Sequence, residues 1–215
     1  MLQKHALEVI EPHDWGDRPV WIIGGGPSVS KCNLEHLRGR TVLAVKDSAR
    51  MLPWATCLWG IDPQWQRNRV ELLTTFRGER WIGSWIDCEL EALPGVRYVC
   101  LRNGRKVFGL SVDPSYVVAG GNSGYSALNF ATLRGAKKIA LVGFDMREEA
   151  NATHWFETYP WRSSGAAKNL VRWAPNFDEI GRDAKRLGIE IVNTSPISLI
   201  KAFPYVSFED TTKWL

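Results

Sequence analysis

The chain has 215 residues, of which 45% are hydrophobic and 23% charged, and its formal net charge is +4. This composition is that of one globular domain with a sizeable core, and it excludes a disordered or low-complexity chain. No apolar run reaches the roughly 18 residues that cross a bilayer, and the first residues lack the apolar core of a signal peptide. We therefore expect a cytoplasmic protein with no membrane partner.

The net charge and the spacing of the cysteines indicate which ligands and which cysteine chemistry to expect. The mild excess of positive charge suits an anionic ligand; it also suits nucleic acid, although no lysine or arginine run is dense enough to argue for one. The four cysteines are widely spaced and form no C-x-x-C pair, which favours free thiols over disulfides or a metal site.

Eleven tryptophans leave two alternatives open. They could stack on a sugar or a base, or they could pack in the core or in a homo-oligomer interface, which is the commoner use. Several of them stand beside polar residues: Trp15, Trp65, Trp155, Trp161 and Trp173.

Short β-rich runs recur along the chain with turn signals between them. They cover Val20–Ile23, Thr41–Val45, Cys57–Gly60, Arg80–Ile82, Val96–Cys100, Lys138–Val142 and Ile189–Asn193. Several are continuously apolar, which is typical of strands buried on both faces of a parallel sheet. Helical patterns lie between some of them, most clearly over Ser123–Arg134 and Asn176–Leu187, and each ends at a glycine. The alternation predicts a single α/β domain over residues 1–215, with a doubly wound, mostly parallel sheet and an extension at residues 1–17.

The first strand runs directly into a glycine-rich turn, Gly24-Gly25-Gly26-Pro27-Ser28. Three glycines keep side chains out of the turn, so backbone N–H groups can approach a ligand, and Ser28 can donate a hydroxyl. The sequence is neither a Walker A loop nor the G-x-G-x-x-G dinucleotide motif. A tight turn without a ligand is the alternative.

A second glycine pair, Gly120-Gly121, precedes Asn122-Ser123-Gly124 at the start of the first expected helix. Asparagine and serine are favoured N-caps, but capping does not explain two preceding glycines. A helix N-terminus attracts anions. Two glycine turns at strand or helix ends therefore predict a phosphate-bearing ligand, namely a nucleotide.

Three aspartates follow expected strands. Asp47 and Asp62 could accept hydrogen bonds from ribose hydroxyls or bind a metal, with an Asx-turn as the alternative for each. Asp145 ends the strand over Lys138–Val142, where it could bind a hydroxyl or a metal or orient a base; its alternative is a loop cap.

Residues 147–172 are rich in tryptophan, serine, asparagine and glycine, and predict an active-site loop at the carboxyl edge of the sheet. His154 lies in this loop and could act as a general base, or it could be an ordinary solvated histidine. At the end of the last strand, Asn193 is a candidate for contacting a base or phosphate, together with Ser195, which could instead begin a helix with Pro196.

These motifs, in this order, resemble a bacterial sialyltransferase family that uses CMP-sialic acid. The turn at Gly24–Ser28 is similar to that family's G-x-G-P-S turn, residues 122–145 to its central segment, and Asn193–Leu199 to its last strand and helix. The same pattern occurs in an archaeal pterin pyrophosphokinase-like family and in phage proteins. The phage proteins resemble the chain most, including at His154-Trp155-Phe156. The likeness spans about residues 20–205.

The resemblance implies a Rossmann-like nucleotide site formed by the two glycine turns. Asp47 and Asp62 fall near positions where the sialyltransferases carry asparagines, and aspartates suit ribose hydroxyls or Mg²⁺. A glycosyltransferase would use Ser28, Asn122 and Ser123 on the phosphate, Asp62 on the ribose, and His154 or Asp145 as the base. A pyrophosphokinase would use Asp62 and Asp145 on Mg²⁺. A phage-type binder acting in the host cytoplasm would hold a nucleotide or nucleic acid without catalysis. We favour the glycosyltransferase; the acceptor stays open, and Mg²⁺ is needed only by the kinase.

Overall fold

The computed structural model describes residues 6–12, 15–16, 18–85, 91–102, 108–150, 152–156, 159, 161 and 166–214. Eight strands in these residues form one sheet, in which every neighbouring pair is parallel. The strands are β1 (Val20–Ile23), β2 (Thr41–Val45), β3 (Cys57–Gly60), β4 (Glu79–Ser84), β5 (Arg97–Arg102), β6 (Tyr116–Val118), β7 (Lys138–Val142) and β8 (Glu190–Asn193). The prediction of a single α/β domain with a doubly wound parallel sheet is confirmed.

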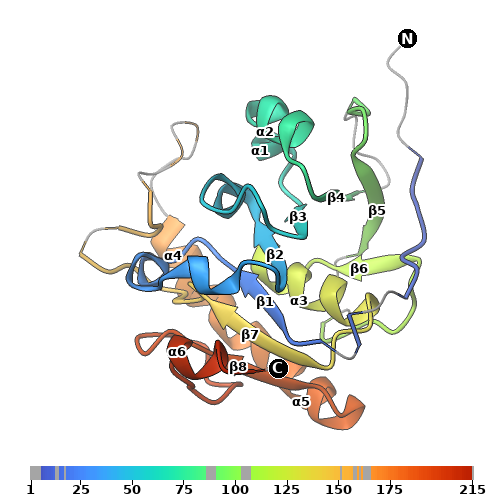
Figure 1. Cartoon of the computed structure of the whole chain (residues 1–215). Coiled ribbons are helices and arrows are strands. Elements are labelled where there is room, and N and C mark those ends of the chain that lie inside the picture. Colours follow the sequence, from blue (N-terminus) through green and yellow to red (C-terminus); the bar gives the residue numbers. More distant parts are fainter. Residues whose placement is uncertain are drawn as a thin grey trace.

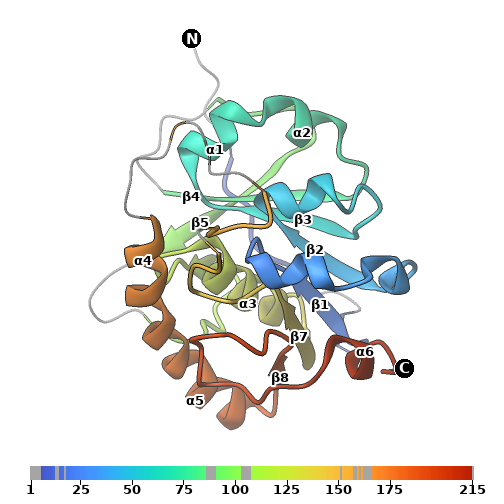
Figure 2. The same cartoon turned by 90° about the vertical axis from the view of Figure 1, so that its left-hand side faces the viewer.

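Helices flank this sheet on both sides (Figure 1 and Figure 2). The α-helices of the described residues are α1 (Pro63–Asn68), α2 (Val70–Thr75), α3 (Ser123–Leu133), α4 (Ala166–Trp173), α5 (Phe177–Leu187) and α6 (Phe208–Thr211). Short 3₁₀ turns are η1 (Pro27–Lys31), η2 (Leu34–Leu37), η3 (Lys46–Arg50) and η4 (Ala174–Asn176). None of the helices described here is long and apolar enough to cross a membrane.

The core forms two layers because side chains alternate across each strand. Val20 and Ile22 of β1 belong to the layer that also contains residues of α3 and α5. Trp21 and Ile23 belong to the opposite layer, which contains residues of α1, α2, α6 and the 3₁₀ turns. Both faces of β1 are therefore buried, which explains its continuous apolar sequence.

The order of the strands creates a switch point beside β1. The sheet runs β6-β5-β4-β3-β2-β1-β7-β8, so the chain travels outward from β1 to β6 and then returns through α3 to β7. In open α/β sheets, ligands bind beyond the carboxyl ends of the strands at such a point.

The structure corrects two local expectations. Residues 166–172 were expected in a loop, but α4 begins at Ala166; the serine- and glycine-rich sequence before it concealed the helical spacing of Leu170 and Trp173. Strand β6 was not expected, because three residues carry little periodicity and its pairing with β5 is decided by tertiary structure.

The tryptophans and cysteines that the structure describes are mainly structural. Trp15, in the expected N-terminal extension, is 2% exposed and contacts the Phe130 ring edge-on, and Trp65 is fully buried. Cys32, Cys57 and Cys100 are free thiols, as predicted, whereas Cys88 lies outside the described residues. Burial raises the pKa of Cys32 to about 11, so this thiol is not a nucleophile at neutral pH.

Candidate functional site

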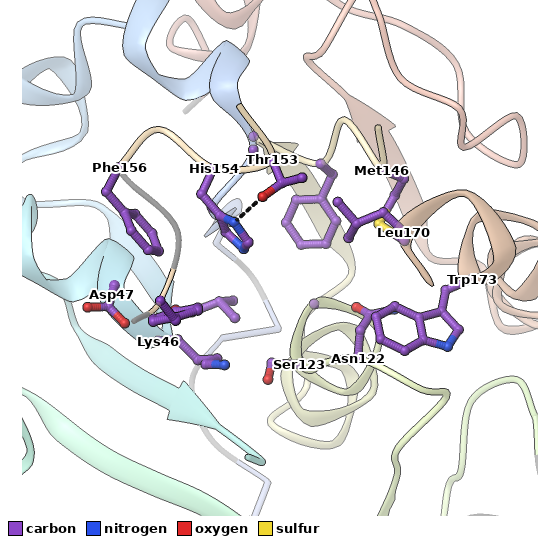
Figure 3. Close-up of a pocket in the computed structure, with 18 residues that line it drawn as sticks. Lys46, Asp47, Asn122, Ser123, Met146, Thr153, His154, Phe156, Leu170 and Trp173 are labelled. Atoms are coloured by element: carbon purple, nitrogen blue, oxygen red, sulfur yellow. Dashed lines mark hydrogen bonds between the residues drawn. The ribbon is translucent and has the colours of Figure 1, made fainter. Parts of the chain in front are cut away.

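A pocket opens at the carboxyl ends of β1, β2 and β7, next to the switch point (Figure 3). Between its walls lies about 710 Å³ of space, part of it open to solvent. Its walls come from six segments, and the lining residues are 24–26, 45–47, 122–124, 143, 144 and 146, 153, 154, 156 and 159, and Leu170 and Trp173 of α4.

The first glycine turn lines this pocket, and its shape is imposed by β7. Gly24 N–H donates to Val142 O over 2.7 Å, and Gly26 N–H donates to Gly143 O over 2.8 Å. A Cβ on Gly24 would lie 2.7 Å from Gly143 O, so a side chain would force the turn away from β7. Within the described part of the chain, the Gly25 N–H has no acceptor. This amide is therefore the donor that the turn can offer to a ligand.

Ser28 and Asp145 meet behind the turn rather than inside the pocket. The Ser28 N–H donates to Asp145 Oδ2 over 2.8 Å, and the Ser28 hydroxyl donates to Asp145 Oδ1. Asp145 is 1% exposed, and a Cβ on Gly26 would lie 2.6 Å from its Oδ2. The carboxylate thus fixes the start of η1, where Pro27 occupies the first position, and neither Ser28 nor Asp145 lines the pocket.

The N-terminus of α3 forms the opposite wall. Asn122 caps the helix by accepting from Tyr125 N–H over 2.9 Å, whereas its buried Nδ2 has no partner in the described structure. Ser123 and Gly124 line the pocket, and N–H groups in the first turn of a helix have no intrahelical acceptor. Such free N–H groups and the helix dipole attract anions.

The two glycines before Asn122 are explained by packing. Gly120 and Gly121 have φ angles of +57° and +94°, in the left-handed region that glycine tolerates best. A Cβ on Gly120 would overlap the Tyr125 ring, and a Cβ on Gly121 would lie 2.8 Å from Trp173 Nε1. The pair therefore lets the chain turn tightly into α3, close to α4.

Lys46 is a pocket residue that the sequence analysis missed. It is the one lysine or arginine among the described lining residues, and its Nζ lies 3.1 Å from Asp62 Oδ2 and 4.8 Å from the Tyr159 ring centroid. Its φ is +56°, and Met146, also in the lining, has a φ of +53°. Such a conformation costs about 1–2 kcal/mol in a non-glycine residue and is concentrated at functional sites. The sequence does contain a signal for this residue, because Lys46 directly follows an apolar strand, whose end borders the ligand edge of such a sheet.

Asp47 and Asp62 use their carboxylates within the protein. The Asp47 side chain is fully buried and accepts from Trp65 Nε1 over 2.5 Å and from Arg69 Nε over 2.8 Å. Asp62 caps α1 by accepting from the N–H groups of Gln64 and Trp65, in addition to its ion pair with Lys46. Asp47 is among the lining residues of the pocket, whereas Asp62 is not.

His154 lies at the pocket, where Figure 3 shows its ring directed inward. Its Nδ1 is 2.9 Å from Thr153 Oγ1, a hydrogen bond that fixes the orientation of the ring. The ring rests on the first glycine turn, because a Cβ on Gly25 would lie 2.9 Å from its Cδ2 and Trp155 N–H donates to Gly25 O. Phe156 packs beside it, with ring centroids 5.0 Å apart.

Asn193 and Ser195 lie outside the lining of this pocket. Asn193 Oδ1 accepts from Ser195 N–H over 3.0 Å, and its Nδ2 donates to Ser198 Oγ over 2.9 Å and to Phe144 O over 3.4 Å. Both residues line a separate pocket of about 450 Å³, where the buried Ser195 Oγ has no partner in the described structure. The fold therefore does not bring these two predicted residues to the main pocket.

The described carboxylates do not form a metal cluster. Within the residues that the structure describes, there is no group of three histidine, cysteine, aspartate or glutamate side chains that could hold an ion. Asp62 pairs with Lys46 and Asp145 bonds to Ser28, so the two carboxylates expected to share Mg²⁺ have different protein partners.

Two solved structures share this fold. The chain has a TM-score of 0.63 and 16% identity with the MAf glycosyltransferase of Magnetospirillum magneticum AMB-1, over 96% of this chain and 36% of that one. It has a TM-score of 0.52 and 14% identity with the sialyltransferase CstII of Campylobacter jejuni, solved with the substrate analogue cytidine-5′-monophosphate, over 89% of this chain and 86% of that one. No family model and no curated protein matches the sequence.

These two comparisons establish the fold of the chain. The chain has a Rossmann-like α/β fold of the kind found in both glycosyltransferases, and it spans about a third of the first of them. Neither is a phage protein or a pterin pyrophosphokinase, so that part of the resemblance stays a prediction.

Proposed function

We propose that this protein is a nucleotide-binding transferase that moves a sugar from a nucleotide-activated donor to an acceptor hydroxyl. The observation that carries the proposal is the pairing, in one pocket, of the α3 N-terminus and its unmatched Asn122 donor with the inward-facing His154. The likeness of the fold to two glycosyltransferases supports the same conclusion.

Neutral donors would hold the phosphate of the donor. They are the Asn122 Nδ2, the Ser123 hydroxyl and the N–H groups of Gly25, Ser123 and Gly124. Aromatic and apolar side chains would pack against the base or the sugar, and they include Phe144, Phe156, Leu170 and Trp173. The remaining turn residues act indirectly, because Gly24, Gly26, Pro27 and Ser28 set the path of the chain around Gly25.

His154 would act as the general base. It would take the proton of the acceptor hydroxyl while that oxygen forms the new glycosidic bond, and the bond to the nucleotide would break with its electron pair leaving on the phosphate. Donors at the α3 N-terminus would stabilise the charge on the departing phosphate. Asp145 is assigned a positioning role, since both of its oxygens bond to Ser28.

Nucleotide release from a panel of CMP-, UDP-, GDP- and TDP-sugars tests this function. We expect one donor class to be consumed by the wild-type protein, slowly with water alone and faster with a suitable acceptor. His154→Gln should lose this turnover while keeping its affinity for the nucleotide. His36→Gln, which changes an exposed histidine, is the matched control and should keep its activity. Nucleotide binding without turnover of any donor would overturn the transferase and favour a non-catalytic binder.

Pyrophosphoryl transfer receives no comparable support. It requires Asp62 and Asp145 on one Mg²⁺ ion, and each carboxylate is held by a different protein partner. Mg²⁺-dependent consumption of ATP by the wild-type protein would revive this alternative.

A further inference from the structure

The groups assigned to the donor phosphate above are all neutral. Backbone amides, a hydroxyl and a side-chain amide can orient a phosphate, but they do not balance its charge. Taking an anion into a partly buried pocket is costly unless a positive charge accompanies it. Lys46 is the one lysine or arginine in the described lining of this pocket, and its side chain is only 11% exposed.

We propose that Lys46 is the cation that recognises the phosphate of the nucleotide, and that Asp62 and Tyr159 hold its ammonium group at the pocket wall. The inference rests on the proposed nucleotide site and adds a residue to it.

The position of the ammonium group is determined by the backbone around it. Asp62 accepts from the N–H groups of Gln64 and Trp65, which fixes the carboxylate at the start of α1. The carboxylate then holds Lys46 Nζ at 3.1 Å, and Nζ also lies over the Tyr159 ring, 4.8 Å from its centroid. A cation held between a carboxylate and an aromatic face keeps its place before the ligand arrives, so little side-chain entropy is lost on binding.

The backbone of Lys46 is equally specific. The chain leaves β2 at Val45 and enters η3 through Lys46, which adopts the left-handed φ of +56°. Asparagine is the uncharged residue with side-chain polarity that best tolerates this region, so Lys46→Asn removes the charge with the least disturbance of the turn. Lys46→Arg keeps the charge.

Calorimetric titration with CMP, UMP, GMP and AMP, and with the four matching nucleosides, tests the role. We expect Lys46→Asn to weaken the best monophosphate by about 10- to 100-fold, the loss typical of a charged hydrogen-bond partner, and to leave its nucleoside within about 2-fold. Lys46→Arg should recover part of the lost affinity. The control is Lys137→Asn, which removes the same charge from an exposed residue just before β7, at the opposite edge of the sheet.

The outcomes separate the two proposals. If the wild-type protein binds none of the monophosphates, the nucleotide site itself fails, and the role of Lys46 fails with it. If the wild-type protein binds a monophosphate and a folded Lys46→Asn binds it equally well, the role of Lys46 alone is overturned. An equal loss of monophosphate and nucleoside affinity also overturns the role of Lys46, because the lysine would then shape the pocket instead of binding the charged phosphate. Circular dichroism and thermal melting verify that each variant is folded.

Discussion

Asn122 and Asn193 stand in similar sequence contexts, each with a serine within two residues, yet they occupy different environments. Asn193, at the end of β8, uses its oxygen on Ser195 N–H and its nitrogen on Ser198 Oγ and Phe144 O. Asn122, at the start of α3, uses its oxygen on Tyr125 N–H, while its buried nitrogen has no partner in the described structure. One asparagine ties protein segments together, and the other keeps a donor at a pocket.

The same contrast separates the other polar residues. Asp145 and Asp47 are buried and bonded to protein donors, so their loss should act on folding. Buried polar groups with unused hydrogen-bonding capacity are costly, and they persist where a ligand or water completes them. The comparison therefore assigns a stabilising role to Asn193 and a binding role to Asn122.

The largest expected effect is a loss of folding stability in a variant of Asn193. Asn193→Ala removes three hydrogen bonds and leaves the buried Ser195 N–H without its acceptor, so we expect the free energy of unfolding to fall by about 2–3 kcal/mol. Urea denaturation measures this change, with the exposed Asn68→Ala as the control. A stable Asn193→Ala variant that has lost nucleotide affinity would reverse the assignment of the two asparagines.

Gly26→Ala should also act on stability. Its Cβ would lie 2.6 Å from Asp145 Oδ2 and from Gly143 O, and such overpacking costs about 1–3 kcal/mol. Gly16→Ala is the matched control, because its Cβ would have an ordinary contact of 3.4 Å. Thermal melting of both variants checks the prediction. An unchanged melting temperature in Gly26→Ala would mean that the turn does not depend on its contact with Asp145.

Asn122→Asp tests the contribution of the Asn122 Nδ2 donor separately from that of the capping oxygen. Aspartate preserves the cap on Tyr125 N–H and suits the helix N-terminus, so the melting temperature should stay the same or rise. The variant replaces the amide donor with a negative charge, and we expect nucleotide affinity to fall by about 10-fold or more. Calorimetry measures this, with Asn68→Asp as the control. Equal affinity in Asn122→Asp would show that Asn122 is a cap and nothing more.

The smallest effect concerns the orientation of His154. Thr153→Val removes the hydroxyl 2.9 Å from Nδ1 while preserving the shape of the side chain, and we expect kcat to fall by roughly 3- to 10-fold. KM for the donor should be unchanged, since Thr153 acts through the histidine. Steady-state kinetics measures both, with the exposed Thr74→Val as the control. A change confined to KM would assign Thr153 to substrate binding instead.

Much of the fold could be predicted from the sequence, because central parallel strands are continuously apolar. The expected bounds of β1, β2, β3 and β7 agree with the structure, whereas β4, β5 and β8 differ at their ends. Strand β6 depends on pairing with β5, and α4 follows a sequence typical of a loop.

The candidate site was predicted less completely. Gly24–Gly26, Asn122–Gly124 and His154 do line one pocket, since glycine turns and helix starts leave local signals. The bond between Ser28 and Asp145 joins residues 117 positions apart, and no local pattern shows which partner a carboxylate will take. Lys46 was missed although it directly follows an apolar strand, because the sequence does not show that Asp62 and Tyr159 lie beside its ammonium group.

An NMR titration of the ¹⁵N-labelled protein with the best-binding nucleotide locates the nucleotide site residue by residue. The 24.3-kDa chain suits this measurement, which follows each backbone amide separately. We predict that the amide signals of Gly25, Ser123 and Gly124 shift most and saturate at one equivalent of nucleotide. If these amide signals stay in place while those around Asn193 and Ser195 shift, the nucleotide binds at the end of β8 and not at the pocket beside α3.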